Sequence, residues 1–84
     1  MATSDPVPLV VPQMGLVEQV IVLEWLVADG ATVAAGEPVV VIETDKAETA
    51  LDAPAAGRIE ILVPVSDAEI AVGSTLAAVH DEVS

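Results

Sequence analysis

Short runs of branched aliphatic residues, each ended by Gly, Pro or Asp within a few positions, most constrain the fold of this chain. The longest run, EQVIVLEWLV at residues 18–27, has apolar residues on both alternating faces and is followed by the turn signal ADG. Branched β-carbons suit a pleated strand and lose rotamer freedom in a helix. No segment repeats its apolar residues with the 3.6-residue period of a helix, so we predict an all-β chain.

Eight strands with closely spaced turn signals predict a small sandwich or barrel. Pro6 and Pro12 confine the first strand to a sheet edge, because proline donates no ladder hydrogen bond. The expected strands are residues 7–12, 18–27, a short piece at Val33, 39–44, 48–54, 58–63, a short piece at Ile70, and 75–80. We expect one domain at 7–80, with residues 1–6 disordered and residues 81–84 as a tail or the start of a linker.

The chain also repeats itself at an offset of 37 residues. The most telling match is Gly36 with Gly73, because each glycine would mark the same turn. The other matches are Val22 with Ile59, Trp25 with Leu62, Leu26 with Val63, Val33 with Ile70, Val39 with Leu76 and Ile42 with Val79. Two similar halves predict two sheets related by a pseudo-two-fold axis.

The charge of the chain excludes several partners. Lys46 and Arg58 are the only basic residues against 14 acidic ones, and the net charge is −12. Nucleic acids and anionic membranes bind clustered Lys and Arg, so neither is expected as a partner. The acidic surface is expected either to keep the domain soluble or to bind a partner that has a basic docking surface. No apolar run approaches the ~18 residues of a membrane span.

Catalytic and metal-binding constellations are missing from the sequence. There are no cysteines, and the single histidine, His80, stands at the end of the last expected strand. Ser66 and Ser74 lie in expected turns without a neighbouring histidine, so no nucleophile is paired with a base. The carboxylates are scattered one by one, and no calcium loop or phosphate-binding loop is present. We therefore predict neither catalytic residues nor a metal site.

Lys46, the only lysine, falls between two expected strands. A lone amine at the apex of a hairpin protrudes and has a fixed orientation, which suits a modifying enzyme. Thr44 and Asp45 suit the turn, and Glu43, Asp45 and Glu48 surround the amine with negative charge. This environment favours the protonated amine, so acylation by an enzyme that supplies its own base is expected rather than Schiff-base chemistry.

The motif IETDKAE followed by APAAG resembles the lipoyl domain of 2-oxo acid dehydrogenase complexes. The segment from Trp25-Leu26 through Gly30, Val33 and Gly36 to the lysine hairpin supports the likeness, as does VPQMG at residues 11–15. The resemblance covers residues 7 to 80 and implies a flattened barrel of two four-stranded antiparallel sheets. It implies lipoate in amide linkage on Lys46, with Thr44, Asp45 and Ala47 presenting the turn. Partner recognition is expected at Glu43, Glu48, Gly15, Leu16 and Val17.

The resemblance further implies a non-catalytic carrier with a swinging arm, monomeric by itself, in bacterial cytoplasm or the mitochondrial matrix. Its expected partners are a lipoate ligase or lipoyl transferase, a thiamin-diphosphate-dependent 2-oxo acid decarboxylase, an acyltransferase core and dihydrolipoyl dehydrogenase. Two positions depart from the family: the loop at 15–19 is about one residue shorter, and Val20 replaces a common Gly. A biotin carboxyl carrier domain, whose lysine usually lies in A-M-K-M, is the alternative. The sequence leaves open which 2-oxo acid is processed and whether the domain is free-standing or part of a longer acyltransferase.

Overall fold

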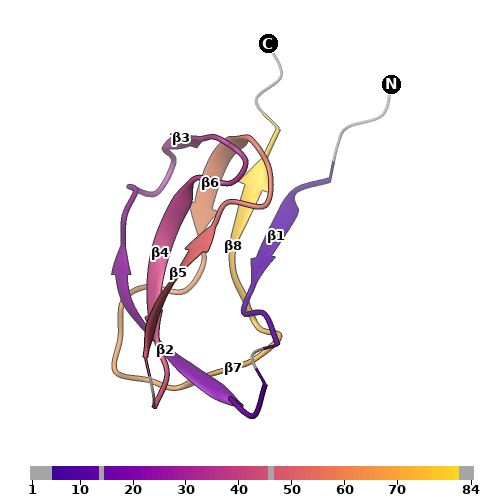
Figure 1. Cartoon of the computed structure of the whole chain (residues 1–84). Coiled ribbons are helices and arrows are strands. Elements are labelled where there is room, and N and C mark those ends of the chain that lie inside the picture. Colours follow the sequence, from indigo (N-terminus) through magenta and orange to yellow (C-terminus); the bar gives the residue numbers. More distant parts are fainter. Residues whose placement is uncertain (1–4, 14, 46, 82–84) are drawn as a thin grey trace.

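Each expected apolar run forms a strand in the computed structural model of the protein, which describes residues 5–13, 15–45 and 47–81 (Figure 1). The strands are β1 (Val7–Val10), β2 (Gln19–Trp25), β3 (Thr32–Val33), β4 (Pro38–Glu43), β5 (Glu48–Asp52), β6 (Gly57–Ile61), β7 (Ile70–Ala71) and β8 (Thr75–His80). No described residue is helical, so the described part of the chain contains no helix that could cross a membrane. The all-β prediction is confirmed.

Two four-stranded sheets carry the eight strands. Their strand orders are β1-β8-β6-β3 and β5-β4-β2-β7, and every pair of neighbours is antiparallel. The proline-flanked strand β1 lies at a sheet edge, as its sequence predicts. The barrel-sandwich expectation is thus confirmed in strand number and direction.

The two halves of the chain are equivalent in topology. Exchanging β1–β4 with β5–β8 converts the order β1-β8-β6-β3 into β5-β4-β2-β7, which is the order of the other sheet. The registers follow the same exchange: Val22 pairs with Ile42 in one sheet, and Ile59 pairs with Val79 in the other, 37 residues later. The predicted pseudo-two-fold therefore holds at the level of residue pairs.

The predicted match of Trp25 with Leu62 is displaced by one residue. The register of β2 on β4 shifts between Val22 and Glu24, whereas β6 pairs with β8 without a shift. An extra residue of this kind is a β-bulge, which moves every later position of the strand by one. The equivalent of Trp25 is therefore Ile61 in place of Leu62. The N–H of Leu26 donates to the carbonyl of Val39, and the N–H groups of both Leu62 and Val63 donate to the equivalent carbonyl of Leu76.

Aliphatic side chains form the core between the sheets. The buried apolar residues are Leu9, Val11, Val20, Val22, Val33, Val39, Val40, Ile42, Leu51, Ala53, Ile59, Leu76, Ala77 and Val79. No polar or charged side chain is buried within the described residues. Trp25 packs at the margin of this core, and its indole Nε1 donates to the carbonyl of Val63 at 2.9 Å. This bond ties the long β6–β7 loop down onto β2.

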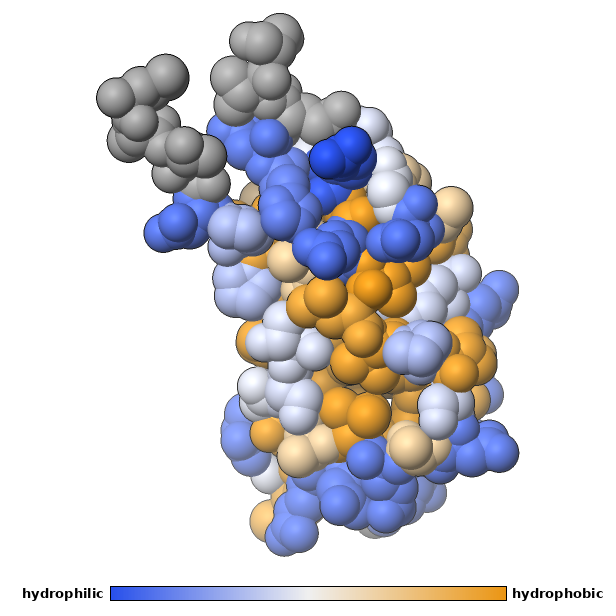
Figure 2. All heavy atoms as spheres, turned by 180° about the vertical axis from the view of Figure 1, so that it is seen from behind, coloured by the Kyte–Doolittle hydropathy of each residue, from blue (hydrophilic) through white to orange (hydrophobic). Residues whose placement is uncertain are grey.

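The molecule is elongated and has two ends. The β4–β5 hairpin and the β1–β2 loop lie at one end, and the start of β1 and the end of β8 lie at the other (Figure 1). Figure 2 shows a band of apolar surface along one face, with hydrophilic side chains gathered at both ends. The hairpin end is therefore hydrophilic and adjoins an apolar band on the face seen in Figure 2.

Candidate functional site

The hairpin between β4 and β5 reverses the chain within two residues. Glu43 and Glu48 are the last cross-strand pair, and beyond them the N–H of Thr44 donates to the carbonyl of Ala47 at 2.9 Å. Asp45 and Lys46 are the two residues enclosed by this bond. Lys46 itself lies outside the described residues, and its predicted modification stays a prediction.

The Thr44 side chain closes the reversal. Its hydroxyl accepts from the N–H of Ala47 and donates to the carbonyl of Ala47, both at 3.2 Å. Side-chain hydroxyls that bond backbone groups stabilise turns in this way. Asp45 and Ala47, which flank the lysine in sequence, are both exposed. A modifying enzyme can therefore reach the backbone on either side of Lys46.

The β1–β2 loop supplies the residues expected to recognise partners. Gly15 has a φ of +64°, a conformation that favours glycine, and its carbonyl accepts from the side-chain amide of Gln13 at 3.2 Å. Leu16 follows and is 99% exposed, whereas Val17 is half-buried against the core. Leu16 is thus exposed to solvent, and Val17 anchors the loop to the core.

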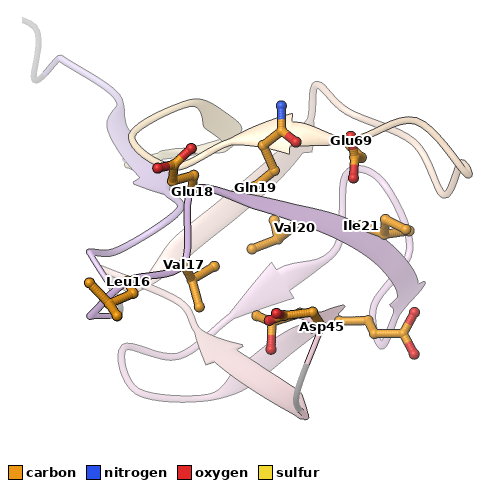
Figure 3. Close-up of a pocket in the computed structure, with 10 residues that line it drawn as sticks. Leu16, Val17, Glu18, Gln19, Val20, Ile21, Asp45 and Glu69 are labelled. Carbon is orange, nitrogen blue, oxygen red and sulfur yellow. The ribbon is translucent and has the colours of Figure 1, made fainter.

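A groove of about 400 Å³ separates this loop from the hairpin (Figure 3). It is lined by Leu16, Val17, Glu18, Gln19, Val20, Ile21, Glu43, Thr44, Asp45 and Glu69. The structure therefore brings Leu16 and Val17 together with Glu43, Thr44 and Asp45, while Gly15, Ala47 and Glu48 do not line the groove. Four carboxylates belong to its lining, so its rim is strongly acidic.

Several lining residues were not foreseen. Glu18, Gln19, Val20 and Ile21 are not among the predicted site residues, and Glu69 comes from the segment before β7. Glu69 reaches the groove because β7 pairs with β2, through the contact of Ile70 with Val20. The internal repeat relates β7 to β3, but the pairing of β3 with β6, which corresponds to that of β7 with β2, is known only from the structure.

The opposite end holds the other two groups that can carry positive charge. Arg58 and His80 are cross-strand partners there, and His80 Nε2 lies 2.8 Å from Glu60 Oε1. The His80 side chain is 40% exposed, as expected for a surface histidine. Within residues 5–13, 15–45 and 47–81, no three His, Asp or Glu side chains are grouped so that they could hold a metal ion.

Comparison with known proteins places this geometry in a family. Residues 7–79 match the family model described as "Biotin-requiring enzyme". The chain is 34% identical over 79 residues, 93% of its length, to the dihydrolipoyllysine-residue acetyltransferase component of the pyruvate dehydrogenase complex of Mycobacterium tuberculosis. It is 35% identical over 81 residues, 94% of its length, to the mitochondrial pyruvate dehydrogenase protein X component of Mus musculus.

A further relative is the dihydrolipoyllysine-residue acetyltransferase component of the acetoin cleaving system of Cupriavidus necator, 39% identical over 54 residues and 63% of this chain. These matches span only 14%, 16% and 14% of the three relatives, in the order given. The likeness thus concerns one small part of each longer protein.

Proposed function

This chain belongs to the biotin and lipoyl attachment family, and from that premise we propose that it is a lipoyl carrier domain with lipoate in amide linkage on Lys46. The observation that carries the proposal is the reversal closed by Thr44 and Ala47, which encloses the only lysine of the chain within two residues. Relatives named as dihydrolipoyllysine-residue acetyltransferases favour lipoate over biotin. The D-K-A context, without the methionines common beside a biotinyl lysine, points the same way.

The hairpin fits an attachment site. An amide on a side chain needs no enclosing pocket, only access for the enzyme that forms it, and Asp45 and Ala47 are exposed on either side. The Thr44 hydroxyl bonds both backbone groups of Ala47 and so closes the turn that a ligase would approach. When attached, lipoate would supply a cyclic disulfide able to take up an acyl group together with two electrons.

The carrier role rests on the family and on what the hairpin presents. This chain would position and present the group rather than catalyse its reactions, as one small part of longer proteins named for their lipoyllysine. We propose that it serves, in turn, a thiamin-diphosphate-dependent 2-oxo acid decarboxylase, an acyltransferase core and dihydrolipoyl dehydrogenase, after loading by a lipoate ligase or lipoyl transferase. Glu43, Glu48, Gly15, Leu16 and Val17 would contact these partners. The relatives are bacterial and mitochondrial, and we place the domain in cytoplasm or matrix accordingly.

Intact-mass analysis tests the proposal directly. The wild-type domain and Lys46→Gln are co-expressed with a lipoate ligase in lipoate-fed cells, and each mass is measured. We expect the wild type to gain one lipoyl group and Lys46→Gln, folded by circular dichroism, to gain none. A modified Lys46→Gln protein, or a wild type that takes up biotin from a biotin ligase instead, would overturn the assignment.

A further inference from the structure

We propose that Val20 is a positioning residue for the β4–β5 hairpin: it holds the last residue of β4 away from the start of β2 and so sets the shape of the tip that a lipoate ligase must fit. The inference rests on the proposed function and deepens it, because it names the residue that fixes the surface offered to the ligase. Val20 is only 1% exposed, so it would act on the ligase through the residues around it.

The second half of the domain shows the same position without a side chain. Val20 and Gly57 are equivalent, 37 residues apart, and Glu43 and His80 are the equivalent last residues of β4 and β8. At Gly57, the carbonyl group of His80 occupies the place that a Cβ would take. The end of β8 thus lies directly against the backbone of β6.

The Glu43 carbonyl cannot take the corresponding place at Val20. Valine carries a Cβ with two methyl groups, and heavy atoms do not pack closer than 3.0 Å to a Cβ. The backbone differs as well, because Gly57 has a φ of +151°, whereas among the residues that the structure describes only glycines have a positive φ. The start of β2 therefore cannot copy the conformation at Gly57, and the end of β4 must lie elsewhere.

This difference falls where the hairpin meets the groove. Val20 lines the groove, and its side chain points toward the hairpin (Figure 3). Glu43 lines the same groove and is the residue from which the hairpin starts. A shift of the end of β4 therefore moves Thr44 and Asp45 relative to Leu16 on the opposite wall.

The separation of the two walls matters to any enzyme that contacts both of them. A ligase that docks on the hairpin and on the exposed Leu16 side chain binds two parts of one surface, with the groove of about 400 Å³ between them. Interface backbones of pre-organised complexes move little on binding, so the relative placement of the two parts is recognised as it stands. We therefore expect the side chain at position 20 to affect binding of the domain rather than the chemical step on the lysine.

Lipoylation kinetics with the lipoate ligase of the same organism test the inference. Val20→Gly removes the Cβ and should let the end of β4 close on β2. We expect its KM for the domain to rise about ten-fold while kcat stays within about two-fold, which is the pattern of lost binding rather than lost chemistry. Val20→Ala keeps the Cβ and should retain the KM of the wild type.

Val22→Gly is the matched control. Val22 and Val20 are both 1% exposed and both lie in β2, but Val22 does not line the groove and its equivalent is Ile59, not a glycine. Both glycine variants should lose stability in urea, and only Val20→Gly should change the KM at a temperature where all the proteins are folded. An unchanged KM in Val20→Gly, or an equal rise in Val22→Gly or in Val20→Ala, would overturn the inference.

Crystal structures of the unmodified proteins give a test that needs no ligase. In the wild type we expect the Glu43 carbonyl oxygen to lie farther from the Cα of Val20 than the His80 carbonyl oxygen lies from the Cα of Gly57. In Val20→Gly the two distances should become equal. Equal distances in the wild type would overturn the inference even if Val20→Gly does not fold. Absence of the lipoyl mass from the wild type would instead overturn the proposed function, and the role of Val20 in ligase recognition with it, and would leave these distances unchanged.

Discussion

Val20 and Gly57 occupy equivalent positions in the two halves of the domain, yet only one of them carries a side chain. Val20 pairs with Ile70, and Gly57 pairs with Val33, the equivalent of Ile70 37 residues earlier. Val20 is 1% exposed and lines the groove at the hairpin end. At Gly57, an added Cβ would collide with the carbonyl oxygen of His80. At Gly57, β8 thus approaches β6 too closely for a side chain, whereas the equivalent position at the hairpin end accommodates Val20.

Gly57→Ala is expected to be among the most destabilising single substitutions in the chain. The φ of Gly57 is +151°, and the new Cβ would also lie 3.1 Å from Val79 Cγ1. Backbone strain of this kind costs about 1–3 kcal/mol, and the collision adds to it. Urea unfolding measures the loss. The matched control is Gly30→Ala, where φ is +88° but no atom lies within 4 Å of the added Cβ. Equal losses in the two variants would contradict the close approach of β8.

Thr44→Val should loosen the hairpin turn while keeping the shape of the side chain. The substitution removes the hydroxyl that bonds both the N–H and the carbonyl of Ala47. A lost hydrogen bond of this kind costs about 0.5–1.5 kcal/mol. We expect a lower unfolding midpoint and slower modification by a lipoate ligase, followed by intact mass. Thr44→Ser keeps the hydroxyl and should behave as the wild type. If Thr44→Ser and Thr44→Val are lipoylated at the same rate, the hydrogen bonds of the Thr44 hydroxyl do not affect modification by the ligase.

The sequence predicts this fold well because its signals are local. Residues 39–44 and 48–54 are branched runs beside a turn, and they form β4 and β5 within a few residues of the expected bounds. The repeat at 37 residues predicts the pairing symmetry from the sequence alone. Both signals can be recognised in the sequence because each strand pattern depends only on residues close in sequence, and the repeat compares two sets of such patterns.

The displaced match of Trp25 and the far wall of the groove could not be read from the sequence. The bulge in β2 leaves no pattern, because positions 20–23 are apolar on both faces and a shift by one residue exchanges one apolar residue for another. Glu69 joins the groove through β7, a strand of two residues that pairs with β2 about 50 residues earlier in the chain. Such a short strand has no periodicity of its own, and its position depends on the closed sheet around it.

Neutralising one member of the Glu43–Glu48 pair should stabilise the hairpin. These residues face each other as the last pair of the β4–β5 ladder, and like charges in that position are destabilising by about 0.2–1 kcal/mol. The test uses Glu43→Gln in the Lys46→Gln background, where no cation offsets the pair. We expect a higher unfolding midpoint, and the gain should shrink in 1 M salt as screening weakens the repulsion.

Glu24→Gln serves as the control for the charge pair, because its β4 partner is Val41 and the substitution changes only the overall charge. If Glu24→Gln and Glu43→Gln raise the midpoint equally, then net charge rather than the local pair is responsible.

Exchanging the two central residues of the turn, in the double variant D45K/K46D, should abolish lipoylation. The exchange keeps the composition and the net charge, and it leaves the bonds between Thr44 and Ala47 in place. The exchange moves the amine back by one residue within the turn, so it would leave the position that the ligase meets. Circular dichroism should show a folded domain, and intact mass should show no lipoyl group under conditions that fully modify the wild type. Efficient modification of the exchanged variant would mean that the ligase reads any exposed lysine at this tip, and that the geometry set by Thr44 and Ala47 is not recognised.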